Sequence, residues 1–196
     1  MERGGIIIYN AKSENLDVKK VLCELEEINE KMYMFNIKPD AGRFLHLLVK
    51  VKQPKNIIEI GTSNGYSTIW VASASEKAKV YTIEIDDGKA GMARENFCRA
   101  GLKNIELLQG DALNVLKNFK VKVDMIFLDA MKKDYIKYIK MLEKNMNENC
   151  VIIADNVISH NEKVSSYIAY MKKNYSSETL QIGAGLELSV KTTFFS

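Results

Sequence analysis

The sequence predicts an α/β protein built on a doubly wound, mostly parallel seven-stranded sheet that ends in an antiparallel hairpin, with helices at its amino terminus. Two observations carry this prediction. From residue 56 onward, short runs of β-branched or aromatic residues alternate with segments long enough to form a helix. Near the carboxyl end, apolar and polar residues alternate one by one, as in a strand with one buried face.

Length and composition favour one domain. A chain of 196 residues with 46% hydrophobic content is ample for a single core, and no repeat or low-complexity linker divides it. We expect a single domain over 1–196, with a helical cap over 1–50 and an α/β core over 55–196.

Charge and cysteine content exclude several classes of protein. The net charge of +3 comes from 28 basic and 25 acidic residues that are interspersed, and even the Lys-rich segment 132–144 contains acids, so it predicts a solvated helix face. Three widely spaced cysteines without a CxxC pair indicate neither a disulfide framework nor a zinc site. Residues 1–10 hold too short an apolar run for a signal peptide, and no membrane-spanning segment is visible, so we expect a cytoplasmic protein.

Two helices are expected before the sheet. The segment 16–34 has apolar residues at helical spacing, and its apolar face is open to three roles: packing on the core, covering a ligand or binding a second copy of the chain. These residues are Val18, Val21, Leu22, Leu25, Ile28 and Met32. A second helix is expected to begin at Pro39, with Phe44, Leu47 and Leu48 inward and His46 in a packing or surface position.

The strands follow from five short apolar runs, each followed by a turn and a helix-length segment. This order predicts parallel strands joined by right-handed crossovers. The runs are 57–60, 80–83, 105–108, 125–128 and 151–153. The turn 183–185 and the alternating residues Leu186, Leu188 and Val190 predict the closing hairpin.

A ligand site is expected at the carboxyl ends of the parallel strands. The first strand runs into a turn with Gly61 and Gly65, where the backbone can approach a ligand closely. This GxxxG spacing is neither the GxGxxG of dinucleotide folds nor a phosphate-binding loop, so the ligand need not carry phosphate. A nucleoside bearing an amino acid, such as S-adenosylmethionine, meets that condition.

Acidic residues at the next two strand ends fit the rest of such a ligand. Glu84 is placed to accept both hydroxyls of a ribose, as an acid about 20 positions beyond the glycine turn does in dinucleotide folds; the alternative is a solvated strand-end acid. Gly110, Asp111 and Ala112 follow the third strand, where an adenine edge would lie.

The last two parallel strands end in oxygen-bearing side chains. Asp129, Asp155 and Asn156 are expected at one edge of the sheet, and such a set suits Mg²⁺ or another divalent cation. The alternative is that both aspartates cap the following helices. Lys132, three residues after Asp129, is the candidate general base because an ammonium beside a cation is disfavoured; Lys133 is the alternative.

With these motifs in view, residues 36–192 resemble the cation-dependent O-methyltransferases related to catechol and caffeoyl-CoA O-methyltransferases, which have a Rossmann-like fold; the chain looks like a short microbial member. The matching segments are 58–61, 65–67, 82–84, 110–113, 127–130 with Lys132 and Tyr135, and 154–156. The resemblance implies that the cofactor is held by Glu59, Gly61, Thr62, Ser67, Glu84, Asp111, Ala112 and Asp129. It further implies a metal on Asp129, Asp155 and Asn156, with Lys132 and Asp129 catalytic.

Three departures from the family pattern concern the acceptor. Met131 stands where many relatives have a second acid, and the late Gly-Asp-Gly appears as 183–185, Gly-Ala-Gly. The segment 157–160 after Asn156 lacks the longer loop that shapes the substrate pocket in plant and animal relatives. His160 on this segment is expected to start a helix, with a place facing the pocket as the alternative.

The expected function is therefore transfer of a methyl group from S-adenosylmethionine to a hydroxyl of a small catechol-like acceptor, in a reaction that depends on a divalent cation. A homodimer is a separate expectation. One alternative is methylation of a hydroxylated uridine in transfer RNA, which the mild basicity permits, although no aromatic-basic groove is visible. Another is a nucleotide-binding module without catalysis. A dehydrogenase is disfavoured by the missing GxGxxG.

Overall fold

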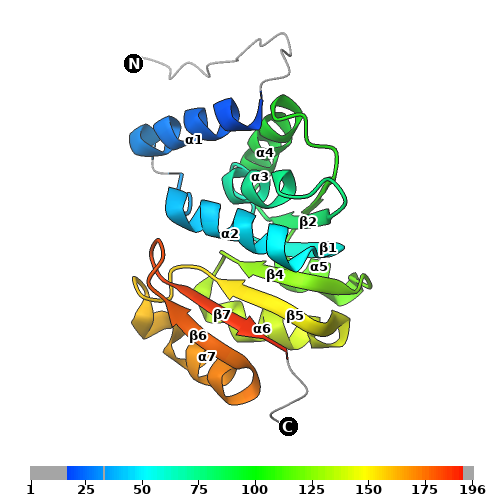
Figure 1. The fold of residues 1–196 in the computed structure, drawn as a ribbon, viewed down its shortest axis with the longest axis vertical. Helices are drawn as coiled ribbons and strands as arrows, with labels where there is room; N and C mark the ends of the chain where they lie inside the picture. Colours follow the sequence, from blue (N-terminus) through cyan, green and yellow to red (C-terminus); the bar gives the residue numbers. More distant parts are fainter. Residues whose placement is uncertain (1–16, 33, 192–196) are drawn as a thin grey trace, which may run out of the picture.

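The computed structural model describes residues 17–32 and 34–191 (Figure 1). The expectation for residues 1–10 lies outside the described residues, as do residues 16 and 33 of the predicted first helix. The division into a cap and a core stays a prediction. None of the helices in the described ranges has the length and apolar character needed to cross a membrane.

One seven-stranded sheet in the order β3-β2-β1-β4-β5-β7-β6 forms the centre of the described chain. The strands β1 to β5 run parallel to one another, and β7 is antiparallel to both β5 and β6. The strands are β1 Asn56–Ile60, β2 Lys79–Glu84, β3 Ile105–Gln109, β4 Val123–Leu128, β5 Met146–Ala154, β6 Ser176–Leu180 and β7 Leu186–Val190. The predicted doubly wound sheet and closing hairpin are confirmed.

Helices cover both faces of this sheet (Figure 1). One face carries α2 Pro39–Lys52, α3 Tyr66–Ser73 and α4 Asp87–Arg99, and α1 Val18–Met32 packs on α3 and α4. The other face carries α5 Ala112–Asn118, α6 Tyr135–Leu142 and α7 Asn161–Asn174. Two short 3₁₀ turns, η1 Lys132–Asp134 and η2 Glu143–Asn145, flank α6.

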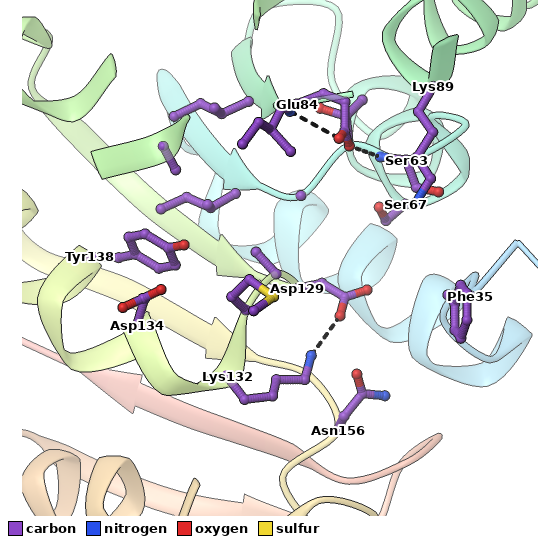
Figure 2. Close-up of a pocket in the computed structure, with 18 of the residues that line it drawn as sticks. Phe35, Ser63, Ser67, Glu84, Lys89, Asp129, Lys132, Asp134, Tyr138 and Asn156 are labelled. Atoms are coloured by element: carbon purple, nitrogen blue, oxygen red, sulfur yellow. Dashed lines mark hydrogen bonds and ion pairs between the residues drawn. The ribbon is translucent and has the colours of Figure 1, made fainter. Parts of the chain in front are cut away.

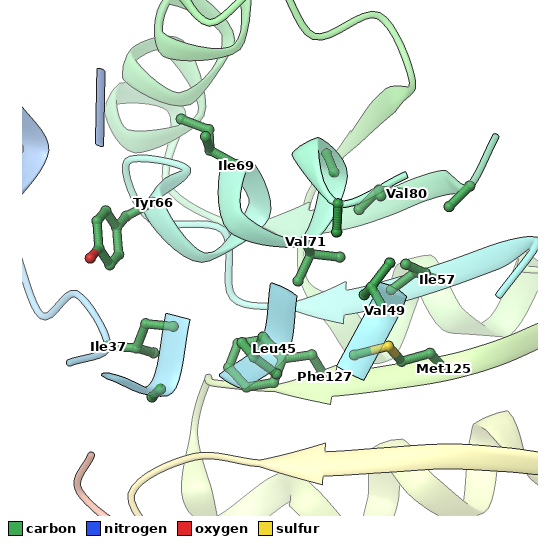
Figure 3. Close-up of a cluster of buried hydrophobic side chains, with 14 of the residues drawn as sticks. Ile37, Leu45, Val49, Ile57, Tyr66, Ile69, Val71, Val80, Met125 and Phe127 are labelled. Atoms are coloured by element: carbon green, nitrogen blue, oxygen red, sulfur yellow. The ribbon is translucent and has the colours of Figure 1, made fainter. Parts of the chain in front are cut away.

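The central strands β1 and β4 are buried on both faces, which explains their continuous apolar runs. In β1, Ile57 packs into the cluster under α2 and α3, while Ile58 and Ile60 pack into the cluster under α5, α6 and α7. Figure 3 shows the first cluster, in which Leu45 and Val49 of α2 lie against Phe127 of β4. The second predicted helix is thus part of the packed core.

The apolar faces of α1 and α2 are only partly buried. On α1, Val21, Leu22 and Leu25 are buried, whereas Ile28 is 39% exposed and Met32 is 69% exposed. Core packing is therefore confirmed for the amino-terminal half of this face, and the two other roles stay open for the rest.

On α2, Phe44 and Leu48 are partly buried as expected, but Leu47 is 62% exposed. The contact face runs through Ala41, Gly42, Leu45 and Val49 instead. The first two residues of this face, Ala41 and Gly42, are small because α3 approaches α2 closely here. A Cβ atom on Gly42 would lie 2.4 Å from the ring nitrogen of Trp70.

Candidate active site

A cavity of about 990 Å³ opens at the carboxyl ends of the parallel strands, where the strand order reverses between β1 and β4. Its size is within the usual range for small-molecule sites. Nine of the predicted residues line it: Gly61, Thr62, Ser67, Glu84, Asp111, Ala112, Asp129, Lys132 and Asn156. Glu59 and Asp155 do not line it, and both are buried directly behind its wall.

The turn after β1 requires glycine at two positions. Gly61 has a φ angle of 102°, and a Cβ atom there would lie 2.1 Å from the carbonyl oxygen of Asp129. Gly65 has a φ angle of 88°, and its Cβ would lie 2.5 Å from the Phe97 ring. The glycines therefore let the turn pass between β4 and α4, as the close-approach prediction requires.

Glu59 is a positioning carboxyl beneath this turn. It is 1% exposed, and its carboxylate accepts hydrogen bonds from the hydroxyls of Ser67 and Thr82, both at 2.6 Å, and from Thr68. Burial raises the pKa of Glu59 to about 7, opposed by the three hydroxyl donors. The side chain thus orients Ser67, which lines the cavity, and does not itself reach the cavity.

Glu84 joins the end of β2 to the glycine turn. One carboxylate oxygen accepts the backbone N–H of Ser63 at 2.7 Å, and the other accepts the N–H groups of Ile85 and Asp86 at 2.9 Å (Figure 2). At 7% exposed it is not a solvated strand-end acid. Each carboxylate oxygen has two acceptor positions, so one position remains for a donor from the cavity, on the oxygen that accepts the N–H of Ser63.

Asp111 lies at the amino end of α5. Its carboxylate accepts the N–H of Asn114 at 3.0 Å and caps the helix, while Asp111 and Ala112 both line the cavity. The side chain of Asp111 therefore has a structural task besides any ligand contact.

The two metal-candidate aspartates lie at neighbouring strand ends. The backbone N–H of Asp129 donates to Ile60 at 2.9 Å, and that of Asp155 donates to Leu128 at 2.9 Å. Neither carboxylate caps a helix, because the residues at those cap positions are Met131 and His160.

The side chain of Asp155 is unsatisfied. Among the described residues its Oδ1 atom is buried without a hydrogen-bond partner. Burial, with repulsion from Asp129, raises the pKa of Asp155. An orphaned buried carboxylate oxygen beside a second carboxylate fits a divalent cation, since oxygen ligands are what Mg²⁺ prefers. The part of the chain that is described has no cluster of three His, Cys, Asp or Glu. The amide of Asn156, which is adjacent to Asp155 and lines the cavity, is the third oxygen-bearing side chain of the predicted set.

Lys132 is held at the cavity wall. Its Nζ atom lies 2.9 Å from Oδ1 of Asp129 and 2.8 Å from the hydroxyl of Tyr135. Figure 2 shows the side chains of Asp129, Lys132 and Asn156 pointing toward one another. Lys133 also lines the cavity but is exposed, whereas Lys132 is held by Asp129 and Tyr135, so the geometry favours Lys132 of the two lysines.

Several residues of the site have no clear signal in the sequence. Ser63 supplies a backbone N–H to Glu84, and Thr68 and Thr82 complete the setting of Glu59. Asn36 and its neighbours line the cavity from the α1–α2 connection, which no motif indicated. His160 both precedes α7, as predicted, and lines the cavity.

In this sheet the antiparallel strand β7 lies between β5 and β6, and the cavity lies where the strand order reverses, between β1 and β4. Together these two features define a class I methyltransferase fold. Comparison with known proteins narrows this class. The O-methyltransferase family model matches residues 11–183, and the chain belongs to that family.

Individual relatives found by the comparison are also O-methyltransferases. Catechol O-methyltransferase of Niastella koreensis is 38% identical over 133 residues, covering 65% of this chain and 60% of that protein. Caffeoyl-CoA O-methyltransferase 2 of Populus trichocarpa is 33% identical over 161 residues, covering 76% and 65%. The chain thus spans less than two thirds of the length of these two relatives. The crystal structure of an O-methyltransferase from Bacillus cereus in complex with SAH is 28% identical, with a TM-score of 0.78 and 94% of both chains covered.

Proposed function

We propose that this protein transfers the methyl group of S-adenosylmethionine to a hydroxyl of a small catechol-like acceptor, with the help of a divalent cation. The observation that carries the proposal is one cavity lined by a glycine turn, by Glu84, by the oxygens of Asp129 and Asn156 and by Lys132. Asp155, with its orphaned oxygen, lies buried directly behind Asn156. Both named relatives are O-methyltransferases, and the Bacillus cereus structure contains SAH.

The cofactor is proposed to lie along the strand ends from β1 to β3. Glu84 would accept a ribose hydroxyl at its remaining acceptor position, and the backbone at Gly61 and Thr62 with Ser67 would hold the amino-acid part. Asp111 and Ala112 would contact the adenine edge. These assignments use the groups that line the cavity.

Asp129, Asp155 and Asn156 would hold the cation. When bound there, Mg²⁺ would lower the pKa of an acceptor hydroxyl and orient two adjacent acceptor oxygens. Asp155 supports this role because its buried Oδ1 has no protein partner. Asp129 supports it because it lines the cavity beside Lys132.

Lys132 is proposed to remove the acceptor proton. The acceptor oxygen then attacks the methyl carbon, the bond from that carbon to sulfur breaks, and S-adenosylhomocysteine leaves while the proton stays on the amine. The remaining work of the chain is positioning, because holding reactants at attack distance removes a large entropic part of the barrier.

The test is calorimetric titration of S-adenosylmethionine into the purified protein with and without Mg²⁺, followed by a methyl-transfer assay on catechol. Cofactor binding with metal-dependent turnover is expected. Cofactor binding without turnover on catechol would favour the non-catalytic module or a different acceptor, and salt-sensitive RNA binding would point to transfer RNA. No cofactor binding would overturn the proposal.

A homodimer stays a prediction. The exposed apolar side chains Ile28, Met32, Leu47 and Val51 of α1 and α2 support it. Light scattering of the purified chain distinguishes a dimer from a monomer. A cytoplasmic location also stays a prediction.

A further inference from the structure

The hydroxyl of Tyr135 lies between the candidate base and the backbone of two strand ends. Tyr135 begins α6 and is fully buried. Its hydroxyl is 2.8 Å from Nζ of Lys132, 3.0 Å from the carbonyl oxygen of Leu128 and 3.4 Å from that of Asp155. The hydroxyl therefore connects Lys132 to the carboxyl ends of β4 and β5.

The single proton of the Tyr135 hydroxyl determines whether this group donates to Lys132 or accepts from it. A phenol has one proton to donate, and the carbonyl oxygens of Leu128 and Asp155 can only accept it. Toward Lys132 the hydroxyl can therefore only accept. Together with Oδ1 of Asp129 it fixes two of the three positions around Nζ that are not bonded to carbon. The third position is left for the acceptor.

We propose that Tyr135 is a positioning residue for Lys132: its hydroxyl orients the amine so that the third position of Nζ faces the acceptor hydroxyl. This inference rests on the proposed function. A lysine side chain is a flexible four-carbon stem, so its productive orientation must be imposed by neighbours. Asp129 supplies one fixed contact, and one contact alone leaves rotation about it free.

The ring of Tyr135 is itself held in place. Tyr167 of α7 packs edge-on against it, with ring centroids 5.3 Å apart and an interplanar angle of 77°. The Nζ atom of Lys132 also lies 5.1 Å from the centroid of the Tyr135 ring. Removing only the hydroxyl therefore leaves the packing of both aromatic rings intact.

The test compares Tyr135→Phe with Tyr167→Phe. The hydroxyl of Tyr167 is equally buried but has no hydrogen-bond partner among the described residues, so its loss is a matched control. With Tyr135→Phe we expect kcat to fall about 10- to 100-fold, while KM for catechol and the Kd for S-adenosylmethionine stay within about twofold. With Tyr167→Phe we expect kcat to stay near the wild-type value.

Rates are expressed per cofactor-binding site, counted by calorimetry, so that a lower folded fraction does not imitate a lower kcat. Unchanged kcat in Tyr135→Phe, or equal losses in the two variants, would overturn the inference while leaving the proposed function standing. A wild-type protein that binds cofactor and transfers no methyl group overturns both.

A double-mutant cycle separates positioning from general support of the fold. If Tyr135 acts through Lys132, adding Tyr135→Phe to Lys132→Met lowers the residual kcat no further. A purely structural role predicts the same fold loss in both backgrounds, and that result would contradict the inference.

Discussion

The Cβ position of Gly61 lies 2.1 Å from the carbonyl oxygen of Asp129. This close approach brings the turn after β1 against the end of β4, so the proposed cofactor turn and the proposed metal ligand share one wall of the cavity. Gly61 and Lys132 line this cavity, and Asp155 and Glu59 are buried behind it.

Replacing Gly61 by Ala should unfold or distort the site. The new Cβ collides with backbone, and the φ angle of 102° is strained for any L side chain, so we expect a loss of more than about 2 kcal/mol in unfolding free energy and loss of cofactor binding. Gly91→Ala in α4 is the control, because no atom lies within 4 Å of its Cβ position. That variant should gain about 0.5 to 1 kcal/mol. Urea denaturation and calorimetry measure both; a stable, cofactor-binding Gly61→Ala protein would contradict the role of the turn.

Lys132→Met should lower kcat by about 100-fold or more, since that is the usual contribution of a general base. Cofactor affinity should be nearly unchanged. Lys133→Met, which removes an exposed neighbouring amine, should retain turnover. Steady-state kinetics on catechol with calorimetry of S-adenosylmethionine checks both. Normal turnover in Lys132→Met would refute the assignment.

Asp155→Asn should change stability and activity in opposite directions. It removes a buried carboxylate whose pKa is raised by burial, so without added metal the unfolding free energy near pH 8 should rise by roughly 1 to 3 kcal/mol. The same change should abolish the increase in Tm that Mg²⁺ gives the wild type, together with turnover.

Asp124→Asn provides the contrast to Asp155→Asn. Its carboxylate accepts the backbone N–H groups of Lys55 and Asn56 at 2.8 and 3.0 Å. This variant should lose stability and keep the Mg²⁺ effect on Tm. Metal-dependent stabilisation that persists in Asp155→Asn would count against the proposed ligand set.

Glu59 should make stability fall with rising pH. Its pKa is raised from 4.5 to about 7 in the folded protein, so its contribution is fully present below pH 4.5 and is lost as pH rises through 7. At about 1.4 kcal/mol per unit, the loss is roughly 3 kcal/mol.

In Glu59→Gln this part of the pH dependence should disappear, whereas in the exposed control Glu106→Gln it should remain. Urea titrations at pH 5 and pH 7.5 measure the difference. Parallel curves for the wild type and Glu59→Gln would show that the buried carboxyl does not titrate in this window.

Local pattern was enough for most of the sheet. The runs 57–60, 80–83, 105–108 and 125–128 lie inside the observed strands β1 to β4. In β1 and β4 the run is continuous because these strands are buried on both faces. Strand β6, with the sequence Ser-Ser-Glu-Thr-Leu, has no such run and was expected only as the partner of β7 in the hairpin. The inward face of α2 was predicted only in part. Leu47 is exposed, and the face that packs on the core runs through Gly42, where Trp70 of α3 approaches closely.

The sequence by itself determined that the first five strands are parallel, and it determined the glycine turn and the acids at the strand ends. Each of these features is a property of residues that are close together in the chain. Tertiary structure decided which of these groups face the cavity: Ser67 lines it while Glu59 lies behind it, and Asn156 lines it while the adjacent Asp155 is buried. It also placed the Tyr135 hydroxyl against the amine of Lys132 and the backbone of Asp155, twenty residues away in sequence. Such contacts depend on how strands and helices pack, which no local pattern of residues specifies.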